Sequence, residues 1–223
     1  MSQYPILGMP LVEATKTFVK ETLSNAEGGH DWFHTQRVYR LAHRLAKEEK
    51  ADEIVVQLAA LLHDIADAKF HNGDETLGPK IAARFLAEKQ VDKAIITHVC
   101  DIIRYMSFKN SLDGKSPLDS TELRVVQDAD RLDAIGAIGI ARTFNYGGFK
   151  NRSMYDPDVP PNLNMSKAEY KKSNAPTINH FYEKLLLLKD QMHTATAKKI
   201  AAKRHDYMLS FLDQFYAEWD SKD

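Results

Sequence analysis

The sequence has one cysteine in 223 residues, Cys100, and almost no net charge. An internal disulfide needs two thiols and a cysteine-based zinc cage needs several, so a single cysteine excludes both. The 30 Lys and Arg residues face 31 Asp and Glu residues, which leaves a formal net charge of −1. Broad, charge-driven binding to nucleic acid requires a basic surplus, so this balance makes nucleic acid an unexpected partner.

Long apolar runs are also missing. Nowhere do roughly 18 apolar residues follow one another, so no membrane span is predicted. The first residues, MSQYPILG, lack the basic segment followed by an apolar stretch that marks a signal peptide. We therefore expect a protein of the reducing cytoplasm that does not act in a membrane.

Alternating strand patterns, hairpin signals and internal repeats are absent, whereas apolar residues recur at helical spacing along most of the chain. The length suits one substantial core, so the prediction is a single all-α domain covering residues 1–223. The expected helices cover residues 10–23, 31–50, 52–67, 78–89, 92–106 and 121–143, followed by C-terminal helices within 176–219.

Acidic residues mark several expected helix starts, because a side-chain oxygen can accept a hydrogen bond from a free amide there. Asp52 is a predicted N-cap, and Asp31 is either a cap or a partner that supports a ligand rather than a ligand itself. Asp119 with Glu122 resembles a capping box. Residues 145–175 lack periodicity and are rich in Gly, Pro, aromatic and basic residues. A loop of that length inside a compact domain is often functional or mobile.

An apolar helical run ends in the pair His63-Asp64. Leu58, Leu61 and Ile65 follow helical spacing around this pair, which predicts a helix buried against a core. Burying a carboxylate costs several kcal/mol unless a partner compensates its charge, and a metal cation is one of the few partners that does. The pair is therefore a candidate for metal binding.

Other candidate ligands lie elsewhere in the chain. His34 is followed three residues later by Arg37, on the same face of an expected helix. Asp128, Asp130 and Asp133 are three carboxylates in one helical segment. Acidic residues are common near helix N-termini, so a solvated capping cluster is the alternative for these three.

Together His34, His63-Asp64 and a later aspartate match the H…HD…D signature of the HD-domain phosphohydrolase superfamily, which the chain resembles over about residues 11–142. Three segments carry the resemblance: GHDWFHTQRV (29–38), ALLHDI (60–65) and QDADRLDA (127–134). The resemblance implies an all-α HD-domain bundle and extends to a small bacterial branch of nucleotide pyrophosphohydrolases. It implies four metal ligands: His34, His63, Asp64 and Asp130. Asp133, one turn further on, is the competing fourth ligand.

Two histidines and two aspartates suit one divalent metal ion with open positions for water and phosphate oxygens. The resemblance favours Mn²⁺, and Mg²⁺, Co²⁺, Ni²⁺, Fe²⁺ and Zn²⁺ stay open. It also implies that Asp67, three residues after Asp64, aligns or deprotonates the attacking water. The alternative for Asp67 is a solvated acid at a helix end.

Basic side chains are needed to neutralise the phosphates of a nucleotide. Arg37, Lys69 and His98 are candidates, and the expected loop adds Lys150 and Arg152 beside aromatic residues that could stack on a base. His98 equally suits a solvated helix face, and the loop residues equally suit an ordinary surface.

The expected activity is hydrolysis of a small nucleotide, with the branch resemblance favouring cleavage of a nucleoside triphosphate to monophosphate and pyrophosphate. A 5′-nucleotidase and a cyclic-nucleotide or alarmone phosphodiesterase would use nearly the same ligands. A metal- and nucleotide-binding sensor without turnover is the alternative of another class, and the oligomeric state stays open.

Overall fold

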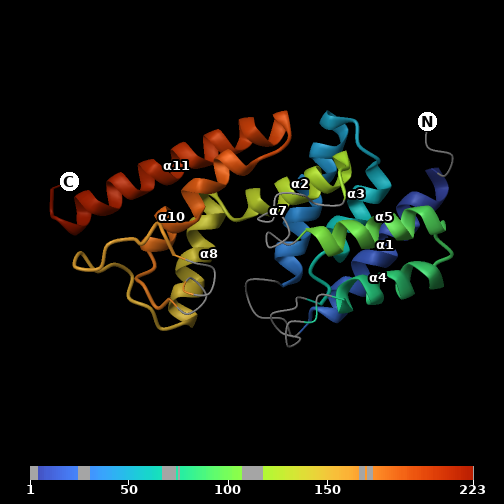
Figure 1. Ribbon diagram of the computed structural model, residues 1–223, viewed down its shortest axis with the longest axis horizontal. Helices are drawn as coiled ribbons and strands as arrows, with labels where there is room; N and C mark the ends of the chain where they lie inside the picture. Colours follow the sequence, from blue (N-terminus) through green and yellow to red (C-terminus); the bar gives the residue numbers. More distant parts are fainter. Residues whose placement is uncertain are drawn as a thin grey trace. The chain divides into compact units, whose positions relative to one another are not determined.

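A computed structural model describes residues 5–24, 31–66, 74, 76–106, 118–165, 169 and 173–222, with side chains from residue 8 onward. This part of the chain is built from helices and contains no strand, which confirms the predicted all-α class. Figure 1 shows the helices α1 (Pro5–Thr22), α2 (Trp32–Glu49), α3 (Glu53–Leu62), α4 (Leu77–Glu88), α5 (Lys93–Tyr105), α7 (Thr121–Asp133), α8 (Gly136–Phe149), α10 (Asn179–Glu183) and α11 (Ala195–Trp219), together with the 3₁₀ helix η2 (Leu185–Gln191).

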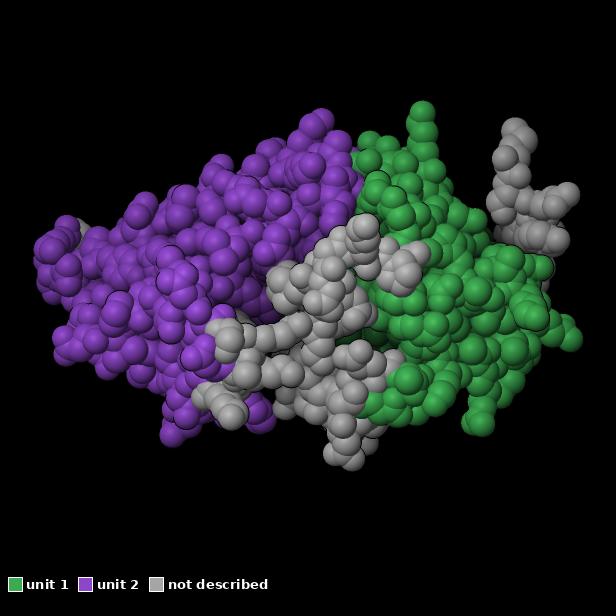
Figure 2. Space-filling view, viewed as in Figure 1, with its two compact units in different colours: residues 1–129 green, residues 130–223 purple. Residues whose placement is uncertain are grey.

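The chain forms two compact units, residues 1–129 and residues 130–223, which Figure 2 distinguishes by colour. Their boundary falls inside α7, an uninterrupted helix from Thr121 to Asp133. Asp130 is therefore carried by the same helix that contributes Val125 and Val126 to the buried core. A single domain over the whole chain stays a prediction.

Helix α3 is the centre of the first unit. It packs against α1, α2 and α5, while α4 packs against α5. Seven of its ten residues are buried, and each buried Leu or Val side chain contributes about 1.5 to 3 kcal/mol relative to an exposed one. The end of α3 is consequently held in a fixed place relative to its neighbours.

Three helix starts are capped by aspartate side chains. Asp31 accepts a hydrogen bond of 2.8 Å from the His34 amide. Asp52 accepts one from each of Ile54 and Val55, and Asp92 accepts one from Ala94. The predicted caps Asp31 and Asp52 are thereby confirmed.

The capping box predicted at Asp119 and Glu122 is wrong. The hydroxyl of Ser120 accepts the hydrogen bond from the Leu123 amide at 3.1 Å, so Ser120 caps α7. Glu122 instead accepts from the backbone amide of Asp52 at 2.9 Å, and Asp119 pairs with Arg124. Glu122 thus contacts a residue distant in sequence instead of the nearby capping residue that the box requires.

Several predicted boundaries need correction. Helix α1 begins at Pro5, so Pro10 lies inside it, where the missing N–H removes one helical hydrogen bond. Helix α3 ends at Leu62, and residues 63–66 form a turn instead of continuing to Asp67 as predicted; Asp67 itself lies outside the described residues.

The single helix expected over residues 121–143 is two helices, α7 and α8. Gly136 has φ +75°, a left-handed backbone value that ends helical continuity. Helix α8 then extends to Phe149, into the range predicted as loop, so the irregular segment begins after residue 149 rather than at 145.

In the second unit α11 packs against α8 and η2, and η2 packs against α10. Its core includes the rings of Phe144, Phe181 and Phe211, with centroids 5.8 to 6.1 Å apart. Thr194 caps α11 by accepting a hydrogen bond of 3.3 Å from the Ala197 amide. Among the described helices, none combines the length and apolar character needed to cross a membrane.

Candidate metal centre

His34 lies in the first turn of α2 and is 1% exposed. It shares the buried face of that helix with Val38, Ala42 and Leu45, which follow at helical spacing. The Asp31 cap holds the His34 amide directly. The start of α2 therefore fixes the backbone from which this imidazole projects.

His63 and Asp64 directly follow α3. The Nδ1 atom of His63 lies 2.8 Å from the carbonyl oxygen of Ala60, one turn earlier. Because a carbonyl only accepts, this contact places the ring hydrogen on Nδ1 and leaves the lone pair on Nε2. A backbone carbonyl on one nitrogen is the usual way in which a protein orients a metal-binding histidine.

The ligand-type atoms of these elements converge. Oδ2 of Asp64 lies 3.4 Å from Nε2 of His34 and 3.4 Å from Nε2 of His63. The two imidazole centroids are 5.4 Å apart. One ligand atom from each of His34, His63 and Asp130 lies within 4.8 Å of the others. Residues from three helical segments, 96 positions apart in sequence at the extremes, thus share one small volume.

Asp133, the competing fourth ligand, has a different partner. Its Oδ2 accepts a hydrogen bond of 2.8 Å from the Arg142 guanidinium, and its side chain is 5% exposed. Asp128 is fully buried. Among the three carboxylates of this segment, Asp130 is the one whose oxygen approaches the two histidines.

The donor set fits a divalent metal ion. Neutral imidazole nitrogens and carboxylate oxygens bind first-row divalent ions, and the carboxylates supply the negative charge that offsets a cation. A spread of at most 4.8 Å between ligand atoms suits atoms that each lie roughly 2 to 2.5 Å from one common centre.

The residues predicted to bind phosphate lie on several different segments of the chain. Arg37 is half-buried on α2, one turn after His34. Lys69 and the candidate base Asp67 lie outside the described residues. In the second unit, the Lys150 ammonium lies 4.8 Å from the centroid of the Phe149 ring, and Arg152 donates a hydrogen bond to the Ser173 carbonyl at 2.6 Å.

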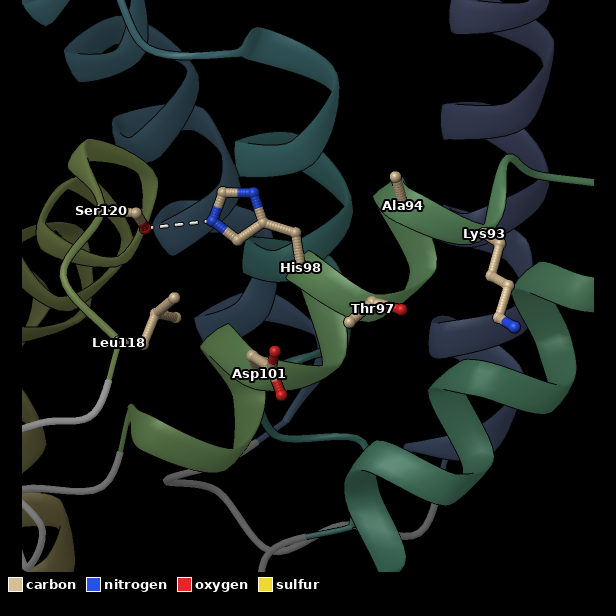
Figure 3. Close-up of a pocket in the computed structure, with 7 residues that line it drawn as sticks. All are labelled: Lys93, Ala94, Thr97, His98, Asp101, Leu118 and Ser120. Atoms are coloured by element: carbon tan, nitrogen blue, oxygen red, sulfur yellow. Dashed lines mark hydrogen bonds between the residues drawn. The ribbon is translucent and has the colours of Figure 1, made fainter.

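His98 lies on α5 at a surface depression of about 650 Å³, which Figure 3 shows with its lining residues. Its Nε2 is 3.0 Å from the Ser120 hydroxyl, drawn as the dashed line, and 3.8 Å from the Glu122 carboxylate. These contacts tie His98 to the capped start of α7.

Comparisons with known proteins show the family to which the chain belongs. The HD domain family matches residues 32–135, a range that includes both histidines, Asp64 and Asp130. The chain is 44% identical to an HD-superfamily hydrolase from Bacillus thuringiensis, with 96% of this chain and 98% of that chain covered and a TM-score of 0.76. The chain therefore belongs to the HD-domain family of metal-dependent phosphohydrolases, as the sequence resemblance implied.

Among individual proteins, the chain is similar to YpgQ of Bacillus subtilis. The sequences are 39% identical over 205 residues, which cover 91% of this chain and 90% of YpgQ. A crystal structure of YpgQ in complex with ADP superimposes with a TM-score of 0.77 at 34% identity, covering 96% of this chain and 97% of that chain.

Sequence reasoning gave no role to three arginines at the end of α7. Arg131 lies in its last turn and donates to Gln191, while Arg142 and Arg204 donate hydrogen bonds to that turn. Arg131 stands in the motif itself, beside Asp130, and this position was the only available signal. Arg142 and Arg204 lie 12 and 74 residues after Asp130. No local pattern points to them.

Proposed function

We propose that the protein hydrolyses nucleoside triphosphates to the monophosphate and pyrophosphate. The observation that carries this proposal is the convergence of His34, His63 and Asp130, with Asp64 beside both imidazoles. The choice of a nucleotide is supported by YpgQ, a relative over nearly the full chain whose structure was solved with ADP. The choice of the bond rests on the resemblance to the pyrophosphohydrolase branch.

His34, His63, Asp64 and Asp130 would hold one divalent ion, for which we propose Mn²⁺. When bound, such an ion polarises a phosphoryl oxygen and lowers the pKa of a coordinated water. The four side chains supply two neutral nitrogens and two carboxylates, which balances the charge of the ion.

Asp67 takes the proton of the attacking water in this proposal, because it stands three residues after Asp64, at the acidic position that the resemblance to the HD-domain family assigns to this role. Arg37, one turn after His34 on α2, pairs with a phosphate oxygen of the substrate, and Lys69 and His98 are further phosphate contacts. Lys150 and Arg152 meet the remaining charge of the nucleotide, with the neighbouring rings of Tyr146 and Phe149 available to the base.

Product analysis tests the proposal. The purified protein is incubated with Mn²⁺ and a panel of nucleoside triphosphates, monophosphates, cyclic nucleotides and alarmones, and the released phosphate and pyrophosphate are measured separately. We expect pyrophosphate from triphosphates and none after excess chelator. Release of phosphate alone would favour the nucleotidase alternative. Nucleotide binding without release of either product would show a sensor.

A further inference from the structure

The last turn of α7 carries Asp130 and is held by contacts from outside the helix. The final carbonyls of a helix lack partners within it, so the last turn tends to fray. In α7 the end is tightened by two short-range bonds, from the Ala134 amide to the Arg131 carbonyl at 3.1 Å and from the Ile135 amide to the Leu132 carbonyl at 3.2 Å. Side chains of distant arginines add to these bonds.

Each of the three residues after Asp130 takes part in an arginine contact. Arg131 donates from one guanidinium nitrogen to the Gln191 carbonyl at 2.6 Å, and the same nitrogen is 2.9 Å from Nε2 of His193. Arg204 donates to the Leu132 carbonyl. Arg142 donates to the Asp133 carbonyl at 3.3 Å and to its carboxylate at 2.8 Å.

Arg131 and Arg204 attach this turn to one framework within the second unit. Gln191 is the last residue of η2, and Arg204 lies in α11, which packs against η2. The segment between them is fixed by the buried side chain of Met192 and by the Thr194 cap of α11. The two contacts therefore reach a structure that does not depend on the metal site.

Gly136 makes room for the second contact. A Cβ atom at this position would lie 2.9 Å from Cγ and 3.1 Å from Cβ of Arg204. The aliphatic part of Arg204 thus occupies the space that any other residue at position 136 would fill. The break between α7 and α8 and the arginine contact on Leu132 are parts of the same packing arrangement.

We propose that Arg131 and Arg204 are positioning residues for the metal centre: by fixing the last turn of α7 on the η2–α11 framework, they hold the Asp130 carboxylate in place toward His34 and His63. This inference rests on the metal site of the proposed function. A ligand that is fixed before binding loses less conformational freedom when the metal binds, which raises affinity without a new bond.

The test compares Mn²⁺ affinity in Arg131→Met, Arg204→Met and the control Arg124→Met. Methionine keeps an unbranched apolar side chain, which preserves packing beside Gly136, and removes the guanidinium. Arg124 lies on the same helix, where it pairs with the exposed Asp119, so its variant has the same change in charge and composition. Affinity is measured by the Mn²⁺ electron paramagnetic resonance signal, and folding by circular dichroism and thermal melting of the metal-free protein.

We expect Kd for Mn²⁺ to rise roughly tenfold in Arg131→Met and in Arg204→Met, which is the lower end of the loss in metal affinity when a supporting contact is removed. In Arg124→Met we expect Kd to stay unchanged. An unchanged Kd in both test variants, whatever their melting temperature, would overturn the inference, as would an equal rise in the control. Should Arg204→Met fail to fold, Arg131→Met, on a half-exposed residue, decides alone. Wild-type protein that binds no Mn²⁺ would instead reject the metal site of the proposed function.

Discussion

The turn after α3 and the last turn of α7 both carry acidic side chains beside a buried apolar core, yet they compensate them differently. At the end of α3, the Asp64 carboxylate lies 3.4 Å from two imidazoles, and His63 is oriented by its own helix. In α7, Asp133 is paired with an arginine from the next helix. Carboxylates of the same chemistry therefore have different partners in the structure, histidines for Asp64 and an arginine for Asp133.

The comparison also separates local from distant support. Ala60, which holds His63, lies three residues before it, so this hydrogen bond orients the imidazole from within its own segment of chain. The α7 end depends on Arg142 and Arg204 and on the backbone of Gln191, which lies 60 residues after Arg131. Changes in distant parts of the chain should therefore disturb Asp130 more than His63.

The largest effect is expected from His63→Ala or Asp64→Ala. Each substitution removes a proposed ligand from a site whose backbone is set by the buried helix α3. We expect Mn²⁺ binding and hydrolysis to fall below detection while circular dichroism stays that of the folded protein. Full activity in either variant would remove the proposed site.

A second large effect is expected from Asp67→Asn. If this carboxylate takes the proton of the attacking water, kcat of the Asp67→Asn variant should be lower by about 10²- to 10⁴-fold. Its Mn²⁺ affinity should stay near that of the wild type. Steady-state kinetics and a metal titration on the same preparation separate the two quantities. A wild-type kcat would leave Asp67 without a catalytic role.

Asp130→Asn and Asp133→Asn form a matched pair one helical turn apart. We expect Asp130→Asn to weaken Mn²⁺ binding by more than the roughly 10- to 100-fold that loss of a supporting residue costs, since a ligand charge is lost, with little change in stability. Asp133→Asn neutralises the buried carboxylate that pairs with Arg142 and should lower the free energy of unfolding by about 1.5 to 3 kcal/mol. Its metal affinity should change by no more than about tenfold.

Metal titration and urea unfolding of both variants check this pair. The reverse result, with Asp133→Asn losing the metal and Asp130→Asn losing stability, would make Asp133 the fourth ligand.

The smallest effect concerns His180, an ionisable group of the second unit. Burial, with a further contribution from the positive charges of Lys184 and Arg152, lowers the pKa of His180 to about 3. Between pH 6.5 and 3 the unfolded chain binds a proton that the folded protein does not, so stability falls as the pH falls through this range.

When the pH falls from 7 to 5, we expect His180 to lower the free energy of unfolding of the wild type by about 2 kcal/mol. His180→Gln cannot take up this proton, so its stability should depend less on pH by that amount. Urea unfolding of both proteins at the two pH values measures the difference, and parallel losses would contradict the expected contribution of His180.

Several features followed from local patterns. Helical spacing predicted the all-α class, and Asp31 and Asp52 predicted helix starts, because a cap contacts an amide only two or three residues away. The His63-Asp64 pair was identifiable since two metal-type ligands closed an apolar run. The resemblance then joined this pair to His34 and Asp130, although nothing in helix periodicity connects them.

Other features depended on contacts between distant segments. At the break, Gly136 lies against the side chain of Arg204. Ser120 caps α7, and Glu122 accepts a hydrogen bond from the distant amide of Asp52. Asp133 is likewise paired with Arg142 from the next helix, whereas Asp130 approaches the two histidines.

By itself the sequence determined the class of fold, the central helix and the residue types of a metal centre, since spacing and side-chain chemistry are properties of short segments. Tertiary structure alone decided which carboxylate reaches the histidines and what holds it there. The physical reason is that a helix fixes only the direction of a side chain, whereas a ligand atom also needs neighbours that hold the helix itself.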